Sequence, residues 1–321
     1  MWPVGLKPQH AVVHGRMLAA SLAILFVSCS QSTKPAGGAA EKTFGSPDEA
    51  GKALVEAVKS GDQNSMLAIF GPGSNSTVYS GDATEDKNSF ENFVKAYGVM
   101  NRWRKVDDKT EILFVGADNR AFPIPLVKND AGQWYFNTAA GKDELLARRI
   151  GRNELAAIDV CAALADAQAE YFSSPHDGAS ARQYAQRFIS DEGKQNGLYW
   201  KSPEGKPRSP LGPLVAFASE EGYKVQQNSY QPFFGYYFRM LYKQGGQAQG
   251  GAKDYIVNGK MTDGFAFMAY PADFGNSGVA TFIINQNHVL YEKDLGQTTK
   301  DIAASMTEFN PDSSWNQVGG S

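Results

Sequence analysis

The chain has 321 residues, which is enough for two domains of ordinary size. Its 42% hydrophobic and 12% aromatic content is that of a globular protein and excludes a wholly disordered chain. The formal net charge of −3 predicts a mildly acidic surface, which argues against nucleic acid as a partner.

Residues 1–28 have the pattern of a secretion signal. Lys7 and Arg16 give a positive beginning, and an apolar run follows at 17–27 and ends in Ser28 and Cys29. The run is too short to cross a bilayer as a mature helix. The pattern resembles the bacterial lipobox, which implies cleavage before Cys29 and acylation of its thiol. Cleavage at another small residue by the ordinary signal peptidase, or retention as an uncleaved anchor, are the alternatives.

This signal predicts the location of the mature protein and the chemistry of its cysteines. We expect an outer-membrane lipoprotein on the periplasmic face of the bacterial envelope, which contacts the membrane through its lipid. Residues 29–42 are small and polar, as in a flexible tether. The only other cysteine, Cys161, then has no disulfide partner, and we expect it to be a buried packing residue.

Residues 43–140 are predicted to form an N-terminal α+β domain. Ser46, Pro47 and Glu49 make a helix-start signal, and helices are expected at about 47–59, 66–70 and 85–101. Strands are expected at 111–115, 121–127 and 134–137. This order is similar to the cone-shaped domains of the nuclear transport factor type, which implies space for a ligand between helix and sheet. Five aromatic residues could line that space or simply fill the core: Tyr97, Trp103, Phe114, Phe122 and Trp134.

Residues 141–152 are predicted to be a connecting helix that ends in a hinge. Glycine costs about 1 kcal/mol relative to alanine inside a helix, so Gly151 marks the break and Asn153 is the expected cap of the next helix. Arg148, Arg149 and Arg152 gather at this point. They are candidates for an anion-binding site, with a satisfied cluster of surface or interdomain ion pairs as the alternative.

The helix expected at 153–172 is the element around which the rest is organised. Apolar residues recur along it at steps of three and four, so that two apolar stripes lie side by side. The pattern predicts a helix that is buried on most of its surface. One stripe consists of Leu155, Ile158, Ala162, Ala165, Ala169 and Phe172, and the other of Ala157, Val160, Leu164, Ala167 and Tyr171.

The stretch from 173 to 232 is rich in proline and glycine, and it is the predicted partner-binding region. Short helices are expected at 181–189 and 213–221. Trp200, Tyr223 and Tyr230 are the candidate binding residues, because exposed aromatic side chains bury a large rigid area against a partner. The alternative is that they cover the open side of the following sheet.

Five antiparallel strands and a final helix complete the chain. The strands are expected at 235–242, 254–258, 264–270, 278–285 and 289–293, and the helix at 298–307. We therefore predict an α+β protein. Helices with a small curved sheet come first, then the long helix, and then a second antiparallel sheet within a domain at 153–321.

Two resemblances accompany this reading. The mature chain is identified as a member of the exported bacterial domain-of-unknown-function family 2950 by phrases such as GRNELAAI, SPLGPLV, GYYFRML and VLYEKDLG. That family implies no activity. The C-terminal half resembles the globular part of type IV pilins and pseudopilins, in which a long helix lies across an antiparallel sheet, although no apolar prepilin helix leads into it. The stretches that carry this second resemblance are 153–158, 167–171, 235–238, 269–271 and 281–283.

No motif for catalysis or for a cofactor stands out in the sequence. His176 and His288, the two histidines outside the signal, lie in different loops without a metal or triad pattern around them. We therefore expect a non-catalytic binding or scaffolding protein with a partner in the envelope and no cofactor. A small-molecule-binding protein or hydrolase that uses a pocket in the N-terminal domain is the alternative.

Overall fold

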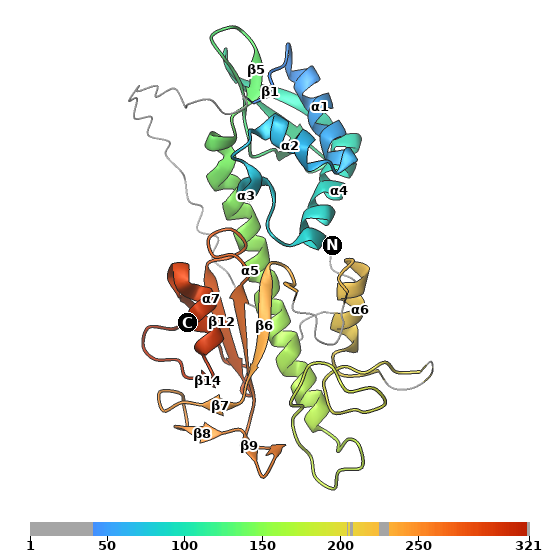
Figure 1. Cartoon of the computed structure of the whole chain (residues 1–321), viewed down its shortest axis with the longest axis vertical. Helices are drawn as coiled ribbons and strands as arrows, with labels where there is room; N and C mark the ends of the chain where they lie inside the picture. The colour runs from blue at the N-terminus through green and yellow to red at the C-terminus, as the bar shows by residue number, and fades with distance from the viewer. Residues whose placement is uncertain (1–40, 204, 206–207, 225–230, 320–321) are drawn as a thin grey trace. The chain divides into compact units, whose positions relative to one another are not determined.

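The order of helices and strands is that of an α+β protein, as predicted. The structure is a computed structural model that describes residues 41–319 except 204, 206–207 and 225–230. The predicted signal at 1–28, most of the predicted tether at 29–42, and the candidate residues Cys29 and Tyr230 lie outside the described residues. The elements below all belong to one unit of the chain, and Figure 1 labels most of them.

Four helices open the described part of the chain. They are α1 (Pro47–Ser60), α2 (Gln63–Phe70), α3 (Asn75–Val78) and α4 (Ala83–Val99). The predicted start signal of α1 is confirmed, because the Ser46 hydroxyl accepts a hydrogen bond from the Glu49 amide at 3.2 Å. The Glu49 carboxylate reaches back to the Gly45 amide at 2.8 Å. The short helix α3 was not predicted, since four residues are too few to show a period.

An antiparallel sheet follows directly. Its strands are β1 (Asn101–Asp107), β2 (Thr110–Val115), β3 (Arg120–Ala121), β4 (Leu126–Lys128) and β5 (Trp134–Phe136). They run in the order β1-β2-β4-β5, and β3 also pairs with β2. Strand β1 was not predicted. The single strand expected at 121–127 is divided, because Pro123 and Pro125 have no amide hydrogen to give to a neighbouring strand.

Helix α5 (Thr138–Phe172) is one continuous helix of 35 residues, so the predicted break at Gly151 is wrong. Asn137 caps its start by accepting from the Ala140 amide at 3.1 Å. Asn153 is not a cap but a buried residue within the helix. The cost of Gly151, about 1 kcal/mol, is small beside the tertiary hydrogen bonds that Arg149 and Asn153 make on either side of it.

Of the two predicted stripes of α5, one is buried along its whole length and the other only in part. Ala157, Val160, Leu164, Ala167 and Tyr171 all belong to the core. In the other stripe Ala165 is 0% exposed and Ile158 and Phe172 are half-buried, whereas Leu155 is 65% exposed and Ala162 and Ala169 are also exposed, so the second stripe is covered less than predicted. The predicted burial of Cys161 is confirmed, since its side chain is 0% exposed.

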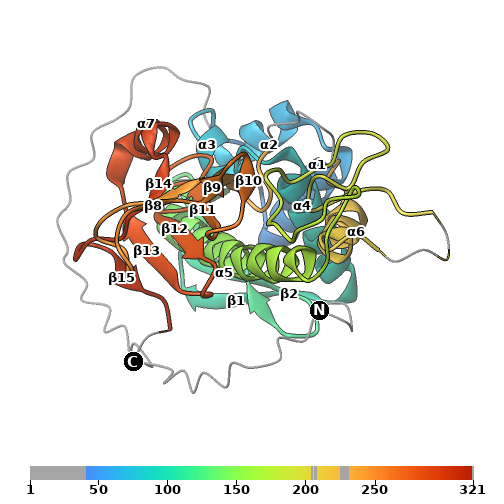
Figure 2. The same cartoon turned by 90° about the horizontal axis from the view of Figure 1, so that it is seen from below.

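The second large sheet packs against the C-terminal half of α5. Its strands are β6 (Tyr236–Leu241), β11 (Ala266–Pro271), β12 (Ala280–Asn285), β13 (Leu290–Asp294) and β15 (Asn316–Gln317). The order is β15-β13-β12-β11-β6, and every neighbouring pair is antiparallel. Figure 2 shows α5 running beside β11 and β12, the two strands that it contacts. The predicted hairpin turn is confirmed, because Ile284 pairs with Leu290.

Seven short elements complete the described part of the C-terminal half of the chain. They are β7 (Lys243–Gln244), β8 (Lys253–Asp254), β9 (Ile256–Val257), β10 (Lys260–Met261), η1 (Gly296–Thr298), α7 (Thr299–Ser305) and β14 (Glu308–Phe309). Helix α7 contacts β11. Among the helices that the structure describes, none has both the length and the apolar composition of a membrane span.

In the proline-rich region one predicted helix is present and one is absent. Helix α6 (Gly212–Glu220) lies where 213–221 was expected. The helix expected at 181–189 does not form. Instead, the Gln168 side chain accepts a hydrogen bond from the Ala185 amide at 2.9 Å and donates one to the Ala185 carbonyl oxygen at 2.8 Å. The Tyr184 amide donates to the Met261 carbonyl oxygen at 2.8 Å. Tertiary partners thus satisfy the backbone groups that a helix would have used.

Candidate functional site

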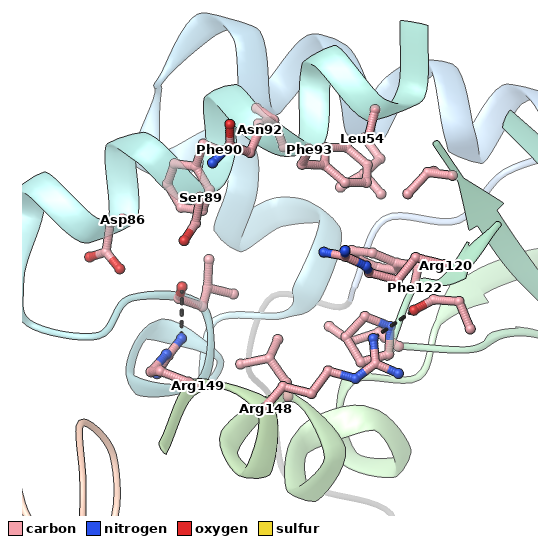
Figure 3. A pocket seen from close by; sticks show the side chains of 18 of the residues that line it. Leu54, Asp86, Ser89, Phe90, Asn92, Phe93, Arg120, Phe122, Arg148 and Arg149 are labelled. Atoms are coloured by element: carbon pink, nitrogen blue, oxygen red, sulfur yellow. Dashed lines mark hydrogen bonds between the residues drawn. The ribbon is translucent and has the colours of Figure 1, made fainter. Parts of the chain in front are cut away.

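A cavity of about 450 Å³ lies between the first helices, the first sheet and the beginning of α5. Figure 3 shows it with α4 on one side and α5 on the other. Residues from α1, α2, α4, β2, the 116–124 segment and α5 form its wall. Gly141 lets α5 come close to that segment, because an added Cβ would meet the Ile124 Cα at 2.5 Å and the Pro123 carbonyl oxygen at 2.6 Å.

The deep wall of the cavity is apolar. Leu54 of α1 and Met66 and Phe70 of α2 are 1%, 3% and 4% exposed. Phe93 of α4 and Phe122 extend this wall, and their ring centres lie 5.5 Å apart. Of the five aromatic residues that the sequence offered as lining, Phe122 lines the cavity and Trp134 is a buried core residue. Tyr97 and Trp103 pack against the same core.

The three predicted arginines do meet at this cavity, together with a fourth that the sequence did not single out. Arg148, Arg149 and Arg152 line it from α5, and Arg120 lines it from β3. Arg120 could not be chosen from the sequence, because nothing local indicates that β3 and α5 come together. The four arginines differ strongly in how many of their guanidinium hydrogen-bond donors already have partners within the protein.

Arg149 is a buried cation with a structural role. It is 5% exposed, and its guanidinium donates to the carbonyl oxygens of Thr77 at 2.7 Å, Val78 at 3.2 Å and Ser76 at 3.5 Å. It also makes a short hydrogen bond to the Asn276 side chain. Burial lowers its pKa, and the nearby carboxylates of Asp86 and Glu85 oppose that shift. Arg149 thus joins α3 to the loop before β12 and has little capacity left for a ligand.

Two acidic residues in the first turn of α4 also line the cavity. Glu85 accepts from the Asn153 side chain at 3.2 Å and lies 3.8 Å from the Arg152 guanidinium. Asp86 accepts from the Ser80 amide at 2.9 Å. Burial raises the pKa of both carboxyl groups. The cavity therefore has the inward acids that a reaction would need, but hydrogen bonds within the fold already use them.

Arg148 and Arg120 have fewer partners within the fold than Arg149 has. Arg148 pairs with Glu144 at 2.7 Å and donates to the Ala121 carbonyl at 2.7 Å. Arg120 has its side chain 73% exposed and meets Asp118 at 3.7 Å. In Figure 3 both arginines lie beside Phe122, on the side of the cavity away from Asp86.

Tyr223 is buried, so its predicted place on an exposed binding surface is wrong. It is 7% exposed, and its hydroxyl donates to the Asp82 carboxylate at 2.9 Å. Asp82 also caps α4 through the amides of Thr84 and Glu85, each at 3.1 Å. Burial, and then the Asp82 charge, raise the pKa of Tyr223. Tyr223 therefore anchors the segment after α6 to the start of α4.

Trp200 lies far from the arginines in a second, loop-lined cavity of about 870 Å³. It is half-buried, and its ring meets Tyr171 edge-on at 6.4 Å and His176 at 5.6 Å. It also packs against the C-terminal core, which favours the alternative reading that it covers the sheet. In the described part of the chain, no group of three His, Cys, Asp or Glu is placed to hold a metal ion.

Comparison with known proteins identifies the family of the chain but assigns it no function. Residues 41–318 match the family described as "Protein of unknown function (DUF2950)". No curated protein and no solved structure matches the chain. The match covers most of the 321 residues and agrees with the family resemblance drawn from the sequence, whereas no comparison supports the pilin-like resemblance. The chain therefore belongs to the DUF2950 family.

Proposed function

We propose that this protein is a non-catalytic binding protein of the bacterial envelope that holds a small molecule in the cavity between α4 and α5. The observation that carries the proposal is the cavity itself. Its volume of about 450 Å³ falls within the usual range for small-molecule sites, about 300–1,000 Å³. Of the described residues that line it, fourteen are aliphatic or aromatic and seven are charged, so apolar groups predominate, as they usually do in such sites.

The hydrolase alternative draws on the inward carboxyl groups of Glu85 and Asp86. A general acid or base has to be within hydrogen-bond reach of a bound substrate and free to exchange a proton with it. Glu85 is held by Asn153 and Arg152, and Asp86 by the Ser80 amide. These contacts fix the first turn of α4, so we favour binding over hydrolysis.

The location proposed for this binding protein rests on the sequence. The short apolar run that ends in Ser28 and Cys29 supports export and a lipid anchor at Cys29, on the periplasmic face of the outer membrane. Intact-mass spectrometry of protein taken from membranes should find an acylated chain that begins at Cys29. A soluble product cut elsewhere, with Cys29→Ala unchanged in location, would contradict this part of the proposal.

A scaffolding contribution of the C-terminal half is part of the same proposal. A long helix across an antiparallel sheet is the arrangement that suggested the pilin-like reading, and the packing of α5 on β11 and β12 supports it. We propose that this half supports the cavity and contacts an envelope partner. The contact of Tyr223 with Asp82 supports the first of these roles, because it ties this half to the start of α4.

Binding can be tested with a neutral apolar probe. N-phenylnaphthylamine should gain fluorescence with the wild-type protein as it enters the cavity. Ser89→Trp should weaken this binding at least about tenfold, because a large side chain at this exposed lining position blocks the entrance.

Lys87→Trp is the matched control. Lys87 lies on the same helix with its side chain 75% exposed, and it is not among the lining residues. We expect it to bind the probe like the wild type. No binding by the wild type, or equal loss in both variants, would refute the proposed cavity function.

A further inference from the structure

The charges around the cavity are divided between two ends that differ in how fully they are satisfied. At one end are Glu85, Asp86 and Arg149, each held by partners from the fold. At the other end Arg120 and Arg148 lie beside Phe122, and Figure 3 shows the apolar wall between the two ends. A ligand would therefore find its free charged partners at the second end.

The second end has unused hydrogen-bond donors. Arg148 uses its Nε and Nη1 groups for Glu144 and Ala121, which leaves its Nη2 group without a partner among the described residues. A guanidinium has five N–H donors. Arg120 has only a distant ion pair with Asp118 at 3.7 Å, in which both side chains are largely exposed. Such an exposed pair contributes little and is easily exchanged for a better partner.

Of the described residues, two arginines, Arg120 and Arg148, and one acid, Asp118, line this end of the cavity, so its charge is positive before Glu144 is counted. Glu144 pairs with Arg148 from an exposed position outside the lining. Arg152 lies towards the other end, 3.8 Å from Glu85. Arginine presents a planar fork that matches the two oxygens of a carboxylate or a phosphate. Among the residues described, a cationic ligand would find only Asp118 at this end, beside two guanidinium groups, and otherwise Glu85 and Asp86, which hydrogen bonds within the fold already occupy.

We infer that the ligand is an amphipathic anion, with an apolar chain against Leu54, Phe93 and Phe122 and a terminal carboxylate or phosphate between Arg120 and Arg148. This inference rests on the proposed function, because it assigns the chemistry of the ligand to the same cavity. It commits to one negatively charged head group. An acyl chain with a free carboxylate and an alkyl phosphate are the two sources that share this chemistry.

The test is displacement of N-phenylnaphthylamine by molecules with one chain and different heads: decanoate, decyl phosphate, decanol and decyltrimethylammonium. The two anions should displace the probe at least about tenfold more strongly than decanol, as expected for charge-assisted hydrogen bonds to arginine. The cation should be weaker still. Tighter binding of decyl phosphate than of decanoate would identify a phosphate ester as the source, and the reverse would identify a fatty acid.

Variants assign the effect to the arginines. Arg120→Gln and Arg148→Gln should each bring decanoate closer to decanol by about tenfold, with both ligands compared in the same variant. Arg104→Gln is the control, because Arg104 is an exposed arginine of β1 outside the cavity lining. Added salt should weaken the anions and leave decanol unaffected.

The outcomes separate this inference from the proposed function. Equal displacement by decanol and decanoate, or stronger displacement by the cation, would overturn the anionic head group and leave the apolar cavity in place. Retention of the anion preference in both arginine variants would overturn the assignment to Arg120 and Arg148. Failure of the probe to bind at all would overturn the proposed function instead.

Discussion

The two halves of α5 pack against their sheets in different ways. In the C-terminal half Ala157, Cys161 and Ala165 are spaced four residues apart and are all 0% exposed, within the core that also contains β11 and β12. In the N-terminal half large rings such as Phe93 and Phe122 stand between α4, α5 and the first sheet. Small side chains let a helix approach a sheet closely, whereas bulky rings such as Phe93 and Phe122 hold the elements that carry them farther apart. The first arrangement closes a core and the second leaves room for a ligand.

The contrast extends to polar groups. The C-terminal core is mainly apolar, and its buried Gln168 is satisfied by Ala185 alone. The cavity half instead carries a buried arginine and two buried acids next to apolar side chains. Buried charges are costly unless they are paired and hydrogen-bonded. Their presence indicates that they hold the cavity wall in place.

The largest expected effect follows from Arg149. Arg149→Met should destabilise the protein by about 3–5 kcal/mol, because it leaves Asp86 without its nearby cation and several backbone carbonyls without a donor. Urea unfolding of the two proteins measures the difference. Arg148→Met is the control, since its ion pair is half-exposed and should cost under about 1 kcal/mol. Equal losses in both variants would contradict the structural role of Arg149.

The packing of the C-terminal half of α5, which forms a closed core with β11 and β12, is tested by comparing the two stripes of this helix. Leu164→Ala should cost about 2–5 kcal/mol, because the side chain is 2% exposed and no neighbour can fill the space. Leu155→Ala should change stability by less than about 0.5 kcal/mol, because Leu155 is 65% exposed. The same unfolding measurement applies. A large loss at Leu155 would mean that this stripe is covered by another surface in solution.

The connection between the halves is tested with Tyr223→Phe. The change removes the hydroxyl that donates to Asp82 at 2.9 Å and preserves the ring packing against Phe233 and Phe234. We expect a loss of about 1–3 kcal/mol, the range for a buried hydrogen bond to a charged group. Probe binding should also weaken, since Asp82 caps the helix that lines the cavity. An unchanged melting temperature would instead place Tyr223 at the surface, as the sequence suggested.

Local signals in the sequence predicted local structure well. The Ser46 cap, helix α6 and the hairpin at 285–288 depend on residues only a few positions apart, and all three are present. The misreadings have long-range causes. Gly151 looked like a break because the partners of Arg149 and Asn153 lie far away in the sequence. Tyr223 looked exposed because Asp82, its partner, is 141 positions away.

The candidate site was predictable only in part, for the same reason. Arg148, Arg149 and Arg152 are close in sequence and were selected as a group. Arg120 joins them through the folding of β3 against α5, and the hydrophobic lining comes from six separate segments of the described chain. A cavity is the volume that packing leaves unfilled, so no pattern of residue types specifies it directly. The alternative interpretation holds for part of the group, because Arg148 and Arg152 form ion pairs with Glu144 and Glu85 and Arg149 is held by hydrogen bonds within the fold.

The smallest expected effect is a dependence of stability on pH that arises from Glu85, which lines the cavity. Burial raises the pKa of Glu85 above its ordinary value of 4.5, so the folded protein holds this proton at pH values where the unfolded chain has lost it. Stability from this group is therefore present below about pH 4.5 and decreases as the pH rises through the folded pKa. Glu85→Gln cannot lose a proton, so its stability should decrease less than that of the wild type between about pH 4 and pH 7. Leu164→Ala, a change in the core beside β11 and β12, should keep the wild-type pH dependence. Parallel pH profiles for the wild type and Glu85→Gln would show that the ion pair with Arg152 outweighs burial at this carboxyl group.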